Sequence, residues 1–212
     1  RQRIERRSLT MTWQDESDTV QFAEPILPKK DCRVRIDFAE SVDWTVKAAN
    51  KGGAPGHEGE VYHAMKLTVV ITDPNIQIEH EGGKPRLSLE HQINLDKYPF
   101  LSKKTGTVEW MGRNGLYELE EALGFDPVFV DGAGASVEPF LTRSGRKVAP
   151  KVEGVKRQVN LDFASSYFHP DGSVNPDNWI NKIVYADIEV EKSEQYGDRN
   201  RIARFKRAPA SV

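Results

Sequence analysis

Residues 31–47 read DCRVRIDFAESVDWTVK, and this stretch indicates the class of fold. Apolar side chains alternate with charged ones from Cys32 to Phe38, which is the period of two of a half-buried β-strand. The alternation breaks at 39–41 and resumes through Trp44, as in one long strand with a bulge or in two short strands. We therefore expect a mainly β domain.

Strands are expected on the C-terminal side of this stretch as well. The segment 60–72 carries the strongest run of β-branched and other apolar residues, and the turn at 73–75 ends it. Polar sequence rich in glycine and proline predicts long loops at 48–59 and 164–178. Shorter apolar or alternating runs predict further strands at 76–79, 87–95, 128–130, 137–141, 148–163, 179–190 and 202–205.

One helix stands out, at 114–123. Leu116 and Leu119 recur at helical spacing, Asn114 is the expected N-cap, and Gly124 is the expected C′ residue. So short a helix is not stable alone in water, so it must pack against another element.

The predicted order is three strands, a helix and two strands, with long loops between the first two and the last two. This is the order of an OB-like β-barrel with extended loops, whose ligand groove lies under those two loops. A β-sandwich is the alternative, because strand spacing alone does not separate the two architectures. We expect a single domain over 31–207, preceded by a leader and acidic segment over 1–30 and followed by a tail over 208–212.

The composition excludes several classes of protein. The 212 residues fit one globular domain. No stretch approaches the roughly 18 consecutive apolar residues of a membrane span, and no apolar segment with a cleavage site follows the first residues. Cys32 is the single cysteine, so an internal disulfide and a thiolate cluster for zinc are excluded. We expect no metal, no cofactor and no membrane, and a reducing cytoplasm such as that of a bacterial host cell.

The first ten residues have two interpretations. They hold four Arg and one Glu and precede Met11, and AGG codons at Arg6 and Arg7 would form a ribosome-binding sequence. Residues 1–10 are then a translated leader from an over-extended bacterial or phage reading frame, and the alternative is a basic N-terminal arm. Removing their net charge of +3 takes the formal charge from −2 to −5. That charge excludes a globally basic nucleic-acid binder but leaves a local basic face open.

The motifs of enzymes are weak in this chain. The five histidines show no HExxH pairing, the GAGA sequence at 132–135 lacks the third glycine of a dinucleotide site, and KKTGT at 103–107 has no GxxxxGK context. Cys32 alternates with core residues and is expected to be a buried structural thiol. Nothing assembles into a nucleophile, a base and a group that orients the base. We therefore expect no catalytic residues.

Aromatic residues interleaved with positive charge are a stronger signal. A surface that binds single-stranded nucleic acid needs cations along the phosphates and exposed rings on which bases stack. A ring on a strand, such as Trp44, can be a core residue instead of a stacking residue. Tyr167 and Phe168 lie in a predicted polar loop and are the stronger candidates. A basic residue on a strand can likewise belong to the solvent-exposed face of the sheet without binding a ligand. The candidate nucleic-acid-binding residues are Trp44, Tyr62, Arg143, Arg146, Lys147, Lys151, Lys156, Arg157, Tyr167, Phe168, Trp179, Arg199, Arg201 and Arg204.

Four segments carry a resemblance to a known family. They are RVRI at 33–36, LEEALG at 119–124, SGRKV at 144–148 and EQYGDRNRIARF at 194–205. These segments resemble a family of small phage proteins that is similar in outline to OB-fold single-stranded-DNA-binding proteins and whose genes lie beside phage replication and recombination genes. The resemblance implies that the chain coats single strands for phage replication or recombination, with proteins of those processes as partners.

The resemblance spans 31–207, with departures. The loops at 48–59, 126–140 and 165–178 are longer than in the family pattern, and an acidic C-terminal tail of the kind that recruits partner enzymes is missing. The recruitment of partners is therefore the part of the family's role that this sequence supports least.

The leading expectation is a non-enzymatic, sequence-tolerant single-stranded-DNA-binding protein on an OB-like barrel, from a phage or a bacterium. One rival is a structural phage protein, such as a tail or decoration subunit, which would also be β-rich and without catalytic motifs. Another is a small-ligand or carbohydrate-binding β-domain, which would stack the same rings on sugars. The sequence leaves open whether the chain forms a homo-oligomer and whether it prefers DNA or RNA.

Overall fold

The computed structural model describes residues 29–76, 88–143, 145–192 and 199–208. The part of the chain that it describes is mainly β, as the sequence predicts, with 46% strand and 14% helix. The expectations for a leader at 1–10, for the strand residues 77–79 and for most of the tail after 207 lie outside the described residues.

Five strands form the main sheet, and shorter strands and helices lie in the connection between its third and fourth strands. The main strands are β1 (Lys29–Thr45), β2 (Val61–Ile71), β3 (Ser88–Asn94), β11 (Ile183–Glu191) and β12 (Arg199–Lys206). The other strands are β4 (Tyr98–Leu101), β5 (Val108–Met111), β6 (Val128–Val130), β7 (Ser136–Val137), β8 (Phe140–Leu141), β9 (Lys147–Val148) and β10 (Lys156–Gln158). The helices are α1 (Asn114–Ala122), α2 (Leu161–Tyr167) and α3 (Pro176–Trp179), with a 3₁₀ turn η2 (Ala49–Lys51) after β1.

β1 is one long strand with a bulge, which is the first of the two alternatives that its sequence allows. Its register against β2 shifts between Ile36 and Phe38. An extra residue at a bulge moves the following side chains to the opposite face of the strand. Ala39 is therefore buried, while Phe38 is 44% exposed although the alternation predicts it on the apolar face.

The order of strands in the main sheet is β12-β11-β1-β2-β3, with every neighbouring pair antiparallel. The two edge strands approach each other: the ring of His91 in β3 contacts that of Phe205 in β12, with centroids 5.4 Å apart. Between the described residues of these two strands there is no hydrogen-bonded ladder. The sheet is thus strongly curved and is not a closed barrel.

α1 packs against β12 and β3 and carries Leu116 and Leu119 into the core. Gly124 follows it with φ +97°, the left-handed conformation expected of a C′ glycine. The N-terminal end differs from the prediction, because Arg113 holds the N-cap position and Asn114 is the first helical residue.

Of the strand predicted at 148–163, only Val148, which belongs to β9, and the three residues of β10 are in strands. The rest of the prediction is wrong, and its last residues belong to α2, which begins at Leu161. The side chain of Asn160 accepts hydrogen bonds from the N–H groups of Asp162 and Phe163 and so caps the helix. Phe163 and Tyr167 are both buried at a spacing of four, so the helical period prevails over an apparent period of two.

The loop predicted at 164–178 is also placed wrongly. It holds the end of α2 and the start of α3, and it precedes the fourth main strand, which begins at Ile183 rather than at 179. The connection between the last two main strands is 192–198, of which 193–198 lie outside the described residues.

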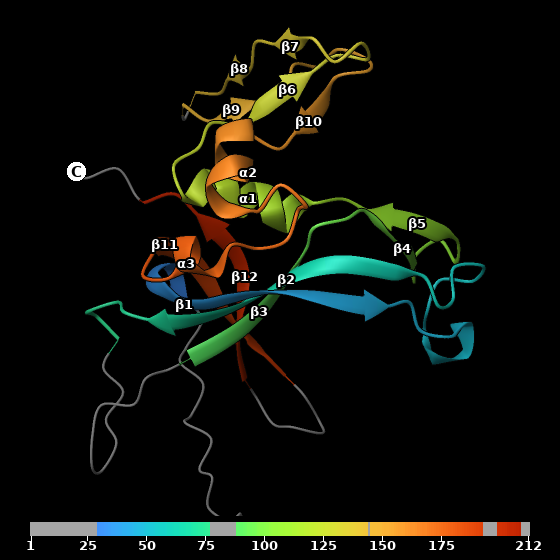
Figure 1. The fold of residues 1–212 in the computed structure, drawn as a ribbon, viewed down its shortest axis with the longest axis horizontal. Coiled ribbons are helices and arrows are strands. Elements are labelled where there is room, and N and C mark those ends of the chain that lie inside the picture. The colour runs from blue at the N-terminus through green and yellow to red at the C-terminus, as the bar shows by residue number, and fades with distance from the viewer. Residues whose placement is uncertain (1–28, 77–87, 144, 193–198, 209–212) are drawn as a thin grey trace, which may run out of the picture.

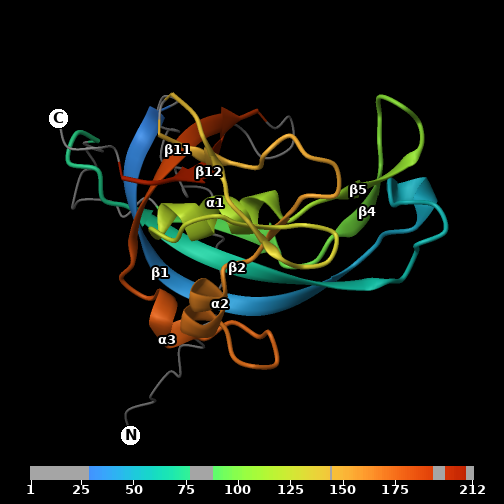
Figure 2. The same cartoon turned by 90° about the horizontal axis from the view of Figure 1, so that it is seen from above.

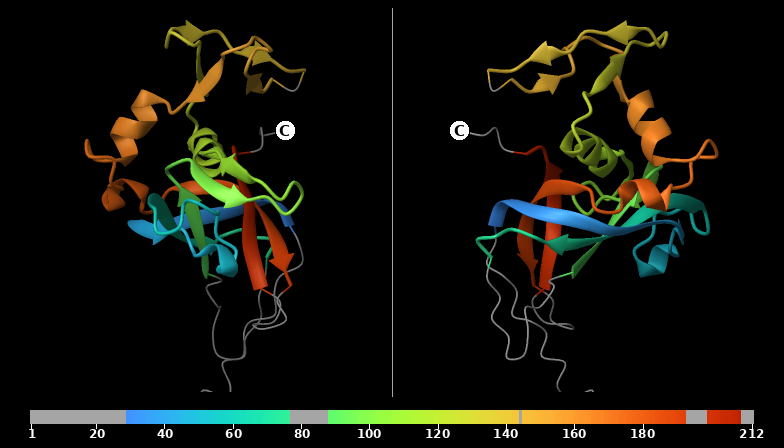
Figure 3. Two further views of the ribbon diagram at one scale, coloured as in Figure 1. Left: turned by 90° about the vertical axis from the view of Figure 1, so that its right-hand side faces the viewer. Right: turned by 60° about the vertical axis from the view of Figure 1, so that its left-hand side comes forward.

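Two projections stand out from the sheet. We call residues 126–160, which contain β6 to β10, the lobe; Figure 1 and both views of Figure 3 show it beyond α1, on the side away from the main sheet. We call residues 42–62 together with 97–111 the arm. It consists of the far ends of β1 and β2, the loop between them and the β4–β5 hairpin, which Figures 1 and 2 show reaching out on one side.

His91 makes the stability of the edge between β3 and β12 dependent on pH. Burial lowers the pKa of His91, and the positive charge of Arg201 lowers it further. The folded-state pKa then lies below the unfolded-state value of about 6.5. Stability that is present above about pH 6.5 is therefore lost as the pH falls through that value towards the folded-state pKa.

We expect His91→Gln to lose less stability than the wild type when urea unfolding is compared at about pH 7.5 and about pH 5.5. The other titrating groups are common to the two proteins, so the difference isolates His91. Equal losses in the two proteins would contradict the assignment.

Candidate nucleic-acid interface

Two of the predicted stacking rings, Tyr167 and Trp179, lie in the core. Trp179 is 0% exposed and Tyr167 is 7% exposed. Their ring centroids are 4.5 Å apart, and the indole N–H of Trp179 donates to the Tyr167 carbonyl at 3.0 Å. Both predictions are wrong, because helices α2 and α3 replace the expected polar loop and turn these rings inward.

Trp44 and Tyr62 are brought together, because they are register partners on β1 and β2. Their centroids are 5.5 Å apart, and Tyr98 of the β4–β5 hairpin meets Trp44 edge-on at 5.0 Å. The Tyr62 hydroxyl donates to Glu60 at 2.5 Å, and this bond raises the pKa of Tyr62 to about 12. Both rings are only partly exposed, so packing within the arm occupies much of their surface.

Most of the predicted cations are held by carboxylates. Arg199 pairs with Glu191 at 2.8 Å, and Arg201 pairs with Glu189 at 3.2 Å, across the β11–β12 ladder. Arg204 pairs with the buried Asp187 at 2.6 Å. Beside α1, two further pairs join Lys147 to Asp126 at 2.6 Å and Arg146 to Glu121 at 3.9 Å. A cation that already has a carboxylate partner has less net attraction for a phosphate.

Arg157 is the centre of a network that joins the lobe to α1. Its guanidinium donates to Glu120 and to the Tyr117 carbonyl, each at 3.1 Å, and also to Glu121. It lies 4.5 Å from the centroid of the Tyr117 ring. The other oxygen of Glu120 accepts the N–H of Asn160 at 3.0 Å. Glu120 is 0% exposed, and burial raises its pKa although these bonds oppose the shift. Arg157 therefore fastens β10 to α1 in place of the phosphate contact that its sequence predicts.

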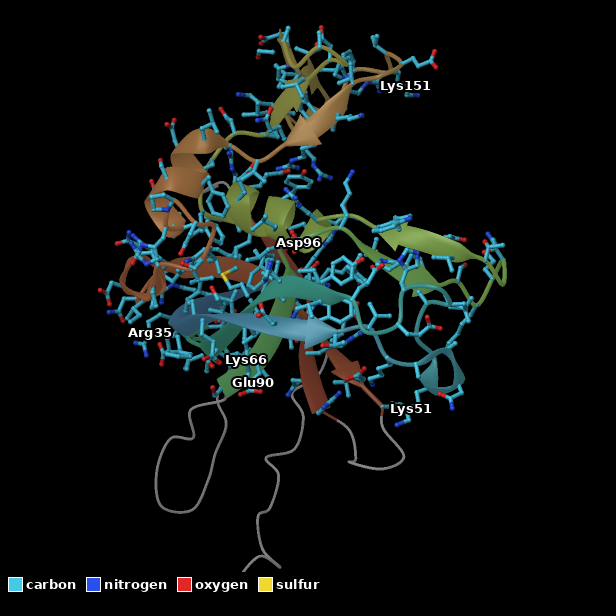
Figure 4. The ribbon with its side chains drawn as sticks, turned by 45° about the vertical axis from the view of Figure 1, so that its right-hand side comes forward. Arg35, Lys51, Lys66, Glu90, Asp96 and Lys151 are labelled. Carbon is cyan, nitrogen blue, oxygen red and sulfur yellow. The ribbon has the colours of Figure 1, made fainter. Side chains whose placement is uncertain are left out.

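Three of the predicted cations remain without a carboxylate partner among the described residues, and all three lie on the lobe. They are Arg143, Lys151 and Lys156, each exposed. Phe140, on β8 of the same lobe, is 64% exposed. Residues 126–160 hold six basic and four acidic residues, although the whole chain has a net charge of −2. Figure 4 shows Lys151 at the outer end of the lobe.

The arm adds an exposed ring that the sequence analysis missed. Trp110 on β5 is 57% exposed, and its only ring contact among the described residues is an edge-on one with His57, at 5.4 Å. The signal available in the sequence is the KKTGT segment at 103–107, whose lysines and glycine are typical of a charged turn and which forms the tip of the hairpin that presents Trp110. The arm also carries five exposed lysines without an ion pair to a described residue: Lys47, Lys51, Lys97, Lys103 and Lys104.

A groove of about 700 Å³ lies beside α1 and α2, and most of its lining comes from α2 and the segment that follows it. Arg113, two residues after β5, and Val159, the first residue after β10, both line it. Phe168, a predicted stacking residue, is half-buried in its wall. In Figure 4, Asp96, next to the groove-lining Leu95, lies between Lys151 of the lobe and Lys51 of the arm.

A second cleft, of about 450 Å³, lies between α1, the end of β12 and the lobe. Its cations are committed to other groups. Arg207 donates to the carbonyls of Glu121, Gly124 and Phe125 and so satisfies the C-terminal end of α1. Lys206 pairs with Asp31 at 2.5 Å. These bonds make the second cleft a structural junction.

Comparisons with known proteins assign the chain to no group: no family model matches it, and neither does any curated protein or solved structure. Within the described residues, no helix has the length and apolar character needed to cross a membrane. The same residues contain no cluster of three or more His, Cys, Asp or Glu side chains arranged to hold a metal ion.

Proposed function

We propose that this protein binds single-stranded nucleic acid, without catalysis, on the face formed by the arm, the groove and the lobe. One observation carries the proposal: the predicted cations that have no carboxylate partner in the described part of the chain, Arg143, Lys151 and Lys156, all lie on the lobe that also exposes Phe140. These cations would contact phosphates. The exposed rings of Phe140 and, on the arm, Trp110 would stack on bases. Because every base has a flat face, such stacking does not depend on the base sequence.

The topology supports an OB-like architecture for the main sheet. In that fold five strands form a partly open barrel, and ligands bind on the face of strands two and three and at the loop between strands one and two. The order β12-β11-β1-β2-β3, with β3 and β12 facing each other and α1 in the connection from β3 to β11, is consistent with it. The arm then extends from the loop between strands one and two.

The biological setting follows from the resemblance described above. We propose DNA as the ligand, the bacterial cytoplasm as the compartment, and phage replication or recombination as the process. Proteins of those processes would be the partners. The rival function is that of a structural subunit of a phage particle. Three exposed apolar side chains of the lobe would suit that role as well: Phe140, Leu141 and Val152.

The proposal predicts salt-sensitive binding of a labelled oligo-dT strand by the full chain. We expect fluorescence anisotropy to show binding at about 50 mM salt and a large loss of affinity at about 200 mM, because phosphate contacts release counterions. Binding of saccharides that is insensitive to salt would favour a carbohydrate-binding domain. Ordered assembly without nucleic acid, together with no binding of oligo-dT at the lower salt concentration, would favour the structural subunit.

A further inference from the structure

The groove beside α1 and α2 has the volume and the partly apolar lining of a site for a small ligand. Its volume of about 700 Å³ is within the range of small-ligand sites. Leu116, Val159 and Leu161 supply apolar walls, and Asp162 is the only carboxylate among its lining residues. Arg113 is the one lining residue with a positive formal charge, so an anionic group of a ligand would pair with it.

Phe168 is held in place within this groove. Its ring contacts those of Phe163 and Trp179, each with centroids 5.8 Å apart and at angles of 73° and 80°. Both neighbours are 0% exposed, so they fix the ring from the core side. A ring that is fixed on one side and reaches a groove on the other can stack on a base at little cost in conformational entropy.

Arg113 supplies the positive charge. Its Nε is buried and has no hydrogen-bond partner within the described part of the chain, and Arg113 forms no ion pair there. A guanidinium without a carboxylate partner can form charge-assisted hydrogen bonds to a phosphate. Because Arg113 lies two residues after β5 and Val159 directly follows β10, the groove adjoins the base of the β4–β5 hairpin and the end of the lobe.

We propose that the groove takes one nucleotide of the bound strand, with the base against Phe168 and the phosphate at Arg113. This inference rests on the proposed function and deepens it. The groove would hold one base in a fixed place, while the rings and cations of the arm and the lobe bind the rest of the strand loosely.

The test is to fill the groove without changing the charge. Ser165 on α2 lines the groove and is exposed, whereas Ser166, its neighbour on the same helix, is exposed but does not line it. We expect Ser165→Trp to weaken the binding of oligo-dT about tenfold and Ser166→Trp to leave it unchanged. Phe168→Leu, which keeps apolar bulk but removes the flat ring, should weaken binding about fivefold, within the range for the loss of one stacked base.

Each outcome separates the two proposals. If the wild type binds oligo-dT and both Ser165→Trp and Phe168→Leu bind it equally well, the groove site is overturned. The proposed function would still stand. No binding of oligo-dT by the wild type would overturn the proposed function and the groove site with it. Thermal unfolding of each variant establishes that a loss of affinity comes from a folded protein, and if Ser165→Trp does not fold, Phe168→Leu decides.

Discussion

Arg157→Met should lower the free energy of unfolding by about 3 to 5 kcal/mol, the cost of removing one partner from a buried ion pair. The variant leaves Glu120, whose side chain is 0% exposed, without the guanidinium that compensates its charge. The Tyr117 carbonyl also loses its hydrogen bond from Arg157. Urea unfolding followed by circular dichroism measures the change.

Two further variants make this prediction specific. Arg146→Met removes a cation that is 65% exposed and lies 3.9 Å from Glu121, so we expect a change of about 0.5 kcal/mol or less. The double variant Arg157→Met with Glu120→Met should be more stable than Arg157→Met alone, because it removes the uncompensated charge. A single variant Arg157→Met that is as stable as the wild type would show that the network does not fasten the lobe to α1.

The fold was predictable where the spacing of apolar residues fitted only one kind of secondary structure. The alternation at 31–47 and the apolar run at 60–72 predicted β1 and β2, and Gly124 marked the end of α1. The bulge in β1 was one of two alternatives, and it lies between Ile36 and Phe38 rather than at 39–41. Prediction failed at 148–163, where Val159, Leu161 and Phe163 have a period of two by chance and Asn160 provides a helix cap. A local pattern does not show which of two periods tertiary packing will select.

The candidate site was predictable only in part. Sequence indicates that cations gather in the C-terminal third, but it does not indicate which have carboxylate partners. Arg157 and Glu120 are 37 residues apart, and Arg204 and Asp187 are 17 apart, so only the fold brings each pair together. The rings show the same limit: Tyr167 is buried by a helix that the sequence analysis did not expect, and Trp110 is exposed by a hairpin that it did not weigh.

In the proposed function, the three lobe cations without a carboxylate partner among the described residues contact phosphates. Replacing Arg143, Lys151 and Lys156 together by glutamine should therefore reduce the salt dependence of oligo-dT binding. On single strands each phosphate contact contributes about 0.7 to the slope of log affinity against log salt, so the loss of three contacts lowers the slope by about 2. The preference among bases should not change, because phosphate contacts carry no sequence information.

A second triple variant with the same change in net charge is the matched control. Lys66, Arg199 and Arg201 pair with Glu90, Glu191 and Glu189 and lie outside the lobe. Their replacement by glutamine alters the overall field equally and removes no proposed phosphate contact.

The most direct test is the slope of log affinity against log salt for the wild type and the two triple variants, measured by anisotropy with one oligo-dT strand. We expect the lobe variant to have a slope smaller by about 2 and the control to keep a slope close to that of the wild type. Equal slopes for the lobe variant and the wild type, or a larger loss in the control, would contradict the assignment of the lobe as the phosphate-binding surface.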